Sequence, residues 1–319
     1  YHVDGFRFDL MGVHDIGTMN EVRRALDRID PSILLYGEGW TAARSPLDES
    51  LRAVKCAGPR LPRIAVFGDD LRDALRGGWG DSTEPGFVSG KSGLDRNVRF
   101  GVVGATAHFQ VGFDSSGDSP VAYGGHSAET INYVSCHDDL SLVDKLRASA
   151  PEGMTEEELV RFDKLAQTVV LTAQGIPSLF AGEEMLRTKG GVSNSHDSPD
   201  RVNRIDWSFK ADHKDVFDYY RGLIALRRTH PAFRLATAAE IERHLRFLDT
   251  GDTHVVAYML VDHAGDDPWR EILVVYNGAR AEKRVRIPPG DWHAVCLDGW
   301  IASEALAVFS GDSIPVPAS

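Results

Sequence analysis

The chain has 319 residues, of which 42% are hydrophobic and 26% charged, so it can bury a sizeable core as one large domain or as two of ordinary size. Its formal net charge of −12 argues against a nucleic acid partner, because phosphate backbones select basic surfaces, and is compatible with a neutral sugar. Three cysteines without a CxxC spacing predict isolated reduced thiols and argue against a disulfide framework or a zinc cluster.

No stretch of the sequence is long and apolar enough to span a bilayer, so no membrane partner is expected. The chain begins without Met, inside what reads as a strand, so we expect the true N-terminus to lie upstream. Localisation therefore stays open, with the cytoplasm slightly favoured over secretion.

Up to about residue 234, short apolar runs alternate with helical patterns. The runs typical of strands occupy residues 2–9, 33–36, 63–67, 130–135 and 177–181. The helical patterns occupy residues 18–30, 155–173 and 216–228, and capping boxes at Thr18 and Thr155 begin the first two. This alternation predicts an α/β domain over residues 1–234 with a parallel sheet. Two long irregular loops are predicted at 77–104 and 187–206.

After about residue 235 the pattern changes to short strands separated by turns. The predicted strands occupy residues 254–261, 271–277, 283–287, 292–296 and 305–309. No helical stripe follows about Arg246. The pattern predicts a modest antiparallel β-sandwich domain over residues 235–319.

Three of the strands in the first region end in a carboxylate. In GFRFDLMG, alternation along the strand places Arg7 and Asp9 on one face, with Asp9 at the carboxyl end. In ILLYGEGW, Glu38 ends the second strand, and the fourth strand ends in SCHDD, with His137 and Asp138. One such acid is typical of loop capping. Three of them with an adjacent Arg and His indicate a site, at the end where parallel barrels carry their chemistry.

Two close carboxylates suit glycoside hydrolysis with retention, in which one acid attacks the anomeric carbon and the other protonates the leaving oxygen. We expect Arg7 to keep Asp9 ionised. Glu38 has no cation nearby in the sequence, so burial and the charge on Asp9 are expected to raise its pKa. Retention predicts carboxyl groups about 5–5.5 Å apart, against about 6.5–9.5 Å for inversion.

These motifs, with VFGDDLRDALRGG and QGIPSLFAGEEMLRTKGGVSNSHDSPDRVNRIDW, resemble glycoside hydrolase family 13, the α-amylase family, in the form of its type I pullulanase branch. The resemblance implies Asp9 as nucleophile, Glu38 as general acid/base and Asp138 as stabiliser of the transition state. It implies that Arg7 and His137 position Asp9 and the sugar.

The resemblance covers most of residues 1–234 and implies the C-terminal part of a (β/α)8 TIM barrel, strands four to eight, followed by the antiparallel β-sandwich. The implied activity is hydrolysis of α-1,6 branch linkages in pullulan, glycogen or amylopectin-type α-glucans, with no cofactor required. Asp139 stands where the family commonly has Asn, which would add acidity near the site.

The earlier strands and their Asp/His motif are not found, so the chain is expected to be an incomplete portion that is inactive alone or unstable as a monomer. Two alternatives stay open. One is another α-amylase-family enzyme, such as an isoamylase, an α-1,4 amylase or a branching enzyme, because bond choice lies in loops. The other is a non-catalytic carbohydrate-binding fragment.

Other polar and aromatic residues allow two interpretations each. Trp40 is either a platform on which a sugar ring stacks or a plug of the barrel mouth. Asn194, Asp200 and Asn203 lie in a loop that the resemblance places near the substrate cleft, where they would bind substrate. Alternatively, this loop hydrogen bonds to itself.

Two groups of acidic residues have the composition of metal ligands. They are Asp69, Asp70 and Asp73, and Glu183 and Glu184 together with His137 and Asp138. For the first group a solvated helix start is favoured. The second would suit Mg or Ca, but the order of the motifs already explains the His–Asp pair. Calcium is therefore not indicated, and no metal is expected.

Overall fold

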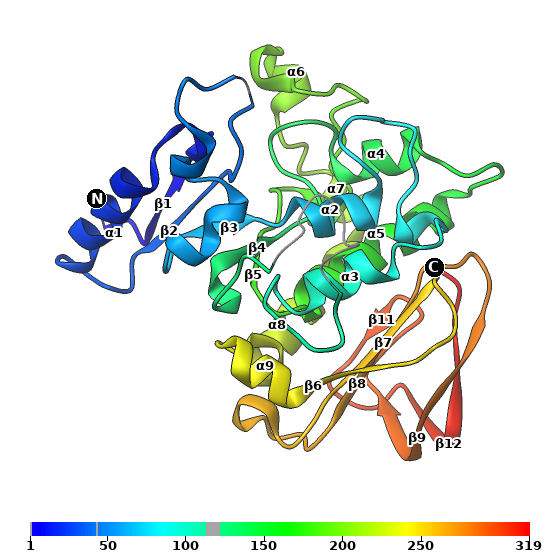
Figure 1. Cartoon of the computed structure of the whole chain (residues 1–319). Helices are drawn as coiled ribbons and strands as arrows, with labels where there is room; N and C mark the ends of the chain where they lie inside the picture. Colours follow the sequence, from blue (N-terminus) through cyan, green and yellow to red (C-terminus); the bar gives the residue numbers. More distant parts are fainter. Residues whose placement is uncertain (1, 43, 113–121) are drawn as a thin grey trace.

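The computed structural model describes residues 2–42, 44–112 and 122–319 (Figure 1). A five-stranded parallel sheet has the strand order β1-β2-β3-β4-β5. Its strands are β1 (Gly5–Phe8), β2 (Leu34–Gly37), β3 (Ala65–Phe67), β4 (Thr130–Asn132) and β5 (Ile176–Pro177). The predicted parallel sheet is confirmed, although most strands are shorter than the apolar runs that indicated them.

Helices lie between β1 and β2, between β3 and β4, between β4 and β5, and after β5. They are α1 (Ile16–Asp27), α2 (Asp69–Arg76), α3 (Asp95–Val102), α4 (Leu142–Ala148), α5 (Glu156–Thr172), α6 (Asp200–Asn203), α7 (Phe209–Asp212), α8 (Lys214–Thr229) and α9 (Ala238–His244). The main hydrophobic core lies between the sheet and α2, α3, α5 and α8. None of the helices in the described part of the chain is both long and apolar enough to cross a membrane.

The first two predicted helix starts had different outcomes. Asp15 is the N-cap of α1 and accepts hydrogen bonds from the Thr18 N–H at 2.8 Å and the Thr18 hydroxyl at 2.6 Å. The predicted start at Thr18 is therefore wrong, because Thr18 serves as a donor to the cap. At α5 the predicted capping box is confirmed: Thr155 and Glu158 exchange hydrogen bonds of 3.0 and 3.2 Å.

The strands after residue 244 are antiparallel, as predicted, and lie at the lower right of Figure 1. One sheet contains β6 (Leu245–Leu248), β7 (Val255–Leu260) and β8 (Ile272–Asn277), a second pairs β9 (Lys283–Ala294) with β12 (Ala307–Val316), and a third pairs β10 (Cys296–Leu297) with β11 (Trp300–Ile301). Apolar side chains of β7 and β9 form one buried cluster. β6 and α9 were not predicted, and two predicted strands, at 283–287 and 292–296, are parts of the single strand β9.

The two predicted loops are partly ordered into helices. The segment 77–104 contains α3, so the prediction of an irregular loop is wrong there. The segment 187–206 contains a 3-10 helix at Ser195–Asp197 and the short helix α6, and is otherwise irregular. The first segment follows α2 in the connection from β3 to β4, and the second lies in the connection that follows β5.

Candidate active site

The acids that follow β1 and β2 are joined by one arginine. Parallel pairing of Arg7 with Tyr36 places the residues beyond the two strands side by side. Arg7 Nη1 donates to Asp9 Oδ1 at 2.8 Å, and Arg7 Nη2 donates to Glu38 Oε1 at 2.5 Å. The Leu10 N–H donates to Glu38 Oε2 at 2.7 Å. A single guanidinium therefore bridges both carboxylates.

The two carboxylates differ sharply in their contact with solvent. The Asp9 side chain is 67% exposed, whereas the Glu38 side chain is 4% exposed. The prediction that Arg7 contacts Asp9 is matched by this geometry. The assumption that Glu38 has no cationic partner is wrong, because Arg7 reaches across from the neighbouring strand.

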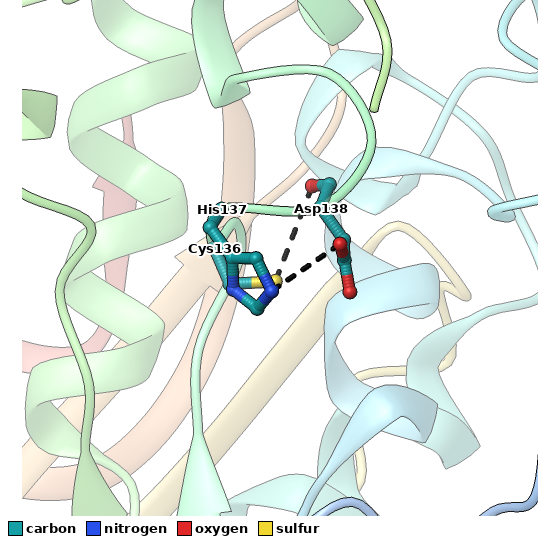
Figure 2. A group of neighbouring side chains, drawn as sticks. All are labelled: Cys136, His137 and Asp138. Atoms are coloured by element: carbon teal, nitrogen blue, oxygen red, sulfur yellow. Dashed lines mark hydrogen bonds and ion pairs between the residues drawn. The ribbon is translucent and has the colours of Figure 1, made fainter. Parts of the chain in front are cut away.

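A histidine after β4 meets these two acids. β4 ends at Asn132, so strand alternation no longer governs the residues that follow it. One carboxylate oxygen each of Asp9 and Glu38 and a ring nitrogen of His137 lie within 4.8 Å of one another. His137 Nε2 lies 3.3 Å from Asp138 Oδ1. A dashed line marks this contact in Figure 2. The ends of β1, β2 and β4 thus bring His137 close to Asp9 and Glu38. Asp138 lies beside His137.

The next acid, Asp139, turns away from this group. Its φ of 59° is in the left-handed region. Its carboxylate accepts a hydrogen bond from Arg76 at 2.9 Å and one from Ser193 at 3.1 Å, and Lys189 Nζ donates to its carbonyl oxygen at 2.5 Å. The expectation that Asp139 adds acidity at the site is therefore wrong, because Arg76 balances its charge within the protein.

Two of the three candidate residues in the loop at 187–206 make hydrogen bonds within the protein, which matches the interpretation of a loop that bonds to itself. Asn194 accepts a hydrogen bond from the Asp139 N–H at 2.8 Å. Asn203 donates to the Ser195 carbonyl oxygen at 2.6 Å and accepts from the Ser195 hydroxyl at 2.7 Å. Asp200 lies exposed at the first residue of α6. The loop thus bonds to itself and to the segment after β4.

An aromatic layer underlies the acids. Trp40 is partly buried, with its ring 6.4 Å from the ring of Phe67, and Phe67 lies 4.9 Å from Tyr133. The Arg7 guanidinium carbon is 5.8 Å from the Phe67 centroid. The sequence interpretation missed Phe67 and Tyr133, although both occupy the apolar runs of β3 and β4. Trp40 keeps both of its interpretations, because it packs on Phe67 and also reaches solvent.

The acidic residues at the start of α2 are paired with cations. Lys55 Nζ lies 2.5 Å from Asp69 and 2.9 Å from Asp70, and Arg72 lies 2.6 Å from Asp73. Because Lys55 and Asp70 are buried, the favoured interpretation of a solvated helix start is wrong for this pair. Among the described residues, these carboxylates enter no group of three or more side chains placed to hold a metal.

The two other acids considered as metal ligands lie apart from His137. Glu183 is buried and accepts hydrogen bonds from the Ser135 hydroxyl and from Gln167. Burial raises the pKa of Glu183 to about 8. Glu184 accepts a hydrogen bond from the Gly182 N–H at 2.9 Å. Through its hydrogen bond with Ser135, Glu183 therefore holds the start of the segment that follows β4.

Two acids bridged by one arginine at adjacent parallel strand ends, with a histidine beside them, form a candidate glycoside hydrolase site of the α-amylase type. Comparisons with known proteins agree with this class. A family model described as the all-beta domain of pullulanase matches residues 241–299. Pullulanase of Bacillus subtilis (strain 168) is 36% identical over 288 residues, which are 90% of this chain and 38% of that protein.

Solved structures extend the similarity to the whole chain. Pullulanase from Bacillus acidopullulyticus matches with a TM-score of 0.90 and 41% identity, over 100% of this chain and 37% of that one. Pullulanase from Paenibacillus barengoltzii, in complex with maltohexaose and α-cyclodextrin, matches with a TM-score of 0.84 and 42% identity, over 99% of this chain and 48% of that one. The chain belongs to the pullulanases of glycoside hydrolase family 13 and spans less than half the length of these relatives.

Proposed function

We propose that the protein is a retaining glycoside hydrolase of pullulanase type, which cleaves α-1,6-glucosidic branch linkages in pullulan, glycogen or amylopectin-type α-glucans. The observation that carries this proposal is the convergence of Asp9, Glu38 and His137 within 4.8 Å, in a chain 36% identical to a pullulanase over 90% of its length. Retention is part of the proposal and requires carboxyl groups about 5–5.5 Å apart, whereas an inverting enzyme keeps them about 6.5–9.5 Å apart to admit a water molecule.

In this proposal the exposed Asp9 attacks the anomeric carbon, and Glu38 gives its proton to the departing glycosidic oxygen. Arg7 stabilises the ionised Asp9 before attack. Once Asp9 is glycosylated its charge is gone, and Arg7 keeps Glu38 as its only anionic partner. This change favours ionised Glu38, which then takes a proton from the incoming water. Asp138, which contacts His137, accepts hydrogen bonds from sugar hydroxyls in the transition state.

We also propose the finer architecture and the domain boundaries. The five parallel strands would be strands four to eight of a (β/α)8 barrel within residues 1–234, and residues 235–319 would form the β-sandwich domain. The strand order and the acids at the carboxyl ends support this assignment. Phe6 on β1 is 42% exposed, which supports the prediction that the 319-residue chain alone is inactive or unstable as a monomer.

The proposed ligand is an α-glucan oligosaccharide or polysaccharide. Its chemistry follows from the maltohexaose, maltotetraose and maltotriose named in the complexes of related pullulanases. The partly exposed Trp40 and the loop residues Asn194, Asp200 and Asn203 are proposed contacts of this glucan. No cofactor is required in the proposal, and calcium has no assigned role.

Product analysis on pullulan tests the proposal in the longest natural form of the protein. Maltotriose supports α-1,6 cleavage, and panose or isopanose would indicate another family member instead. Asp9→Asn should lower kcat at least about 10³-fold, whereas Asp4→Asn, an exposed acid beside the same strand, should leave it unchanged. Glucan binding without any product from the parent protein would refute catalysis and favour a carbohydrate-binding role.

A further inference from the structure

Three different kinds of metal-ligating side chain lie together in the segment that follows β4. One ligand atom each of Cys136, His137 and Asp138 lies within 4.8 Å of the other two. Figure 2 shows the thiol, the imidazole and the carboxylate of these consecutive residues in one small group, joined by the contact between His137 and Asp138. We propose that this group binds a thiophilic divalent cation of the Zn²⁺ type.

The donor set selects the class of metal. A thiolate, an imidazole nitrogen and a carboxylate oxygen are all regular ligands of Zn²⁺, at about 2.0–2.3 Å. Two ligands at such distances in a tetrahedron lie roughly 3.3–3.8 Å apart. The spacing of the three atoms therefore has to tighten by no more than about 1.5 Å, which side-chain rotation supplies. Mg²⁺ and Ca²⁺ prefer oxygen ligands and gain little from the thiol and the imidazole.

Two of the three side chains of the group are accessible to solvent. The side chains of His137 and Asp138 are 52% and 46% exposed, so an ion from solution can reach them. His137 also belongs to a second group of close side chains, with Asp9 and Glu38. These two carboxylates share one cation, Arg7, and Lys189 Nζ donates to the His137 carbonyl oxygen at 3.3 Å.

Occupation of this site would inhibit the proposed hydrolysis. The ion would coordinate the Asp138 carboxylate and the His137 imidazole, which are proposed to bind the sugar. It would also place positive charge next to Asp9. Binding converts the Cys136 thiol to a thiolate and releases its proton to solvent. The site itself rests on geometry alone, whereas its inhibitory effect rests on the proposed function.

Zn²⁺ binding is measured on the longest natural form of the protein by competition with a chromophoric chelator, so no turnover is needed. Cys136→Ser should weaken the affinity at least about tenfold, because serine is a far poorer ligand than a thiolate. The matched control is Cys56→Ser, which removes an exposed thiol elsewhere and should leave the affinity unchanged. A Co²⁺ titration should show a thiolate-to-metal charge-transfer band that Cys136→Ser abolishes.

A second measurement needs no substitution: Zn²⁺ should protect Cys136, but not Cys56, from alkylation in the parent chain. Equal affinity in the parent and Cys136→Ser, or no binding at micromolar Zn²⁺, would overturn the proposal. In a pullulan-hydrolysing form of the protein, Zn²⁺ should inhibit reversibly and Mg²⁺ should not. Failure of pullulan hydrolysis leaves the binding result standing, so the two proposals fail separately.

Discussion

The carboxyl of Glu183 makes the stability of the fold depend on pH in a way that one substitution isolates. Glu183 is 2% exposed, and a second buried acid, Asp163, is 1% exposed. Burial, with a smaller contribution from the charge of Asp163, raises the pKa of Glu183 from 4.5 to about 8. Burial also raises the pKa of Asp163 to about 7.

The direction of the effect follows from these values. Because the pKa of Glu183 is higher in the folded state, the folded chain holds this proton more tightly than the unfolded chain between pH 4.5 and about 8. The resulting stabilisation is complete below the unfolded pKa and is lost as the pH rises through that window, by about 1.4 kcal/mol per pH unit. Between pH 4.5 and neutrality, the loss is about 3 kcal/mol.

Glu183→Gln keeps the shape and stays uncharged at every pH, so it should remove this dependence. We expect the variant to gain free energy of unfolding over the parent as the pH rises from about 5.5 to about 7.5, by roughly 1–3 kcal/mol. Urea unfolding followed by tryptophan fluorescence measures the difference. The matched control is Glu184→Gln, which neutralises the adjacent, less buried acid. Parallel pH profiles for the parent and Glu183→Gln would refute the reasoning.

Three further substitutions test contacts around the site and the helices. Arg7→Met leaves the buried Glu38 without its cation and should lower the free energy of unfolding by about 2 kcal/mol in urea titrations; a stability equal to the parent's would contradict this. Arg76→Met should lower the free energy of unfolding by about 3–5 kcal/mol, because it leaves the Asp139 carboxylate without its cation. Adding Asp139→Asn should restore part of that loss. A double variant as unstable as Arg76→Met alone would count against the ion pair. Thr155→Ala removes the cap of α5 and should lower the stability by about 1 kcal/mol, and calorimetry with an unchanged Tm would argue that the cap contributes nothing.

The sequence was sufficient to place the first two acids at strand ends because the alternation of side chains along a strand is a local property. Asp9 lies two residues after Arg7 and directly beyond the end of β1, so their contact follows from side-chain alternation continued at the strand end. The contact from Arg7 to Glu38 was missed because it depends on the pairing register of two strands and on the length of an arginine side chain. Neither quantity is visible in the spacing of residues within one strand.

Competing local signals explain two other errors. Asp15 and Thr18 are both good N-cap residues, and the capping-box pattern favoured the wrong one. The helix α3 was missed because its eight residues, DRNVRFGV, are charged and glycine-containing and lie in a segment rich in turns. Tertiary packing of Val98, Phe100 and Val102 in the core decides its conformation, and a propensity argument does not contain that information.

The segment after β4 is held at both of its ends, and this explains how exposed side chains can keep a defined position. At the beginning, the Ser135 hydroxyl donates to the buried Glu183. At the end, Asp139 is fixed by Arg76 and by the Asn194 side chain. The three residues between these anchors carry the thiol, imidazole and carboxylate, and their backbone has little freedom to move. Two of the supporting bonds, from Ser135 to Glu183 and from Arg76 to Asp139, are buried, and such support favours a preorganised site.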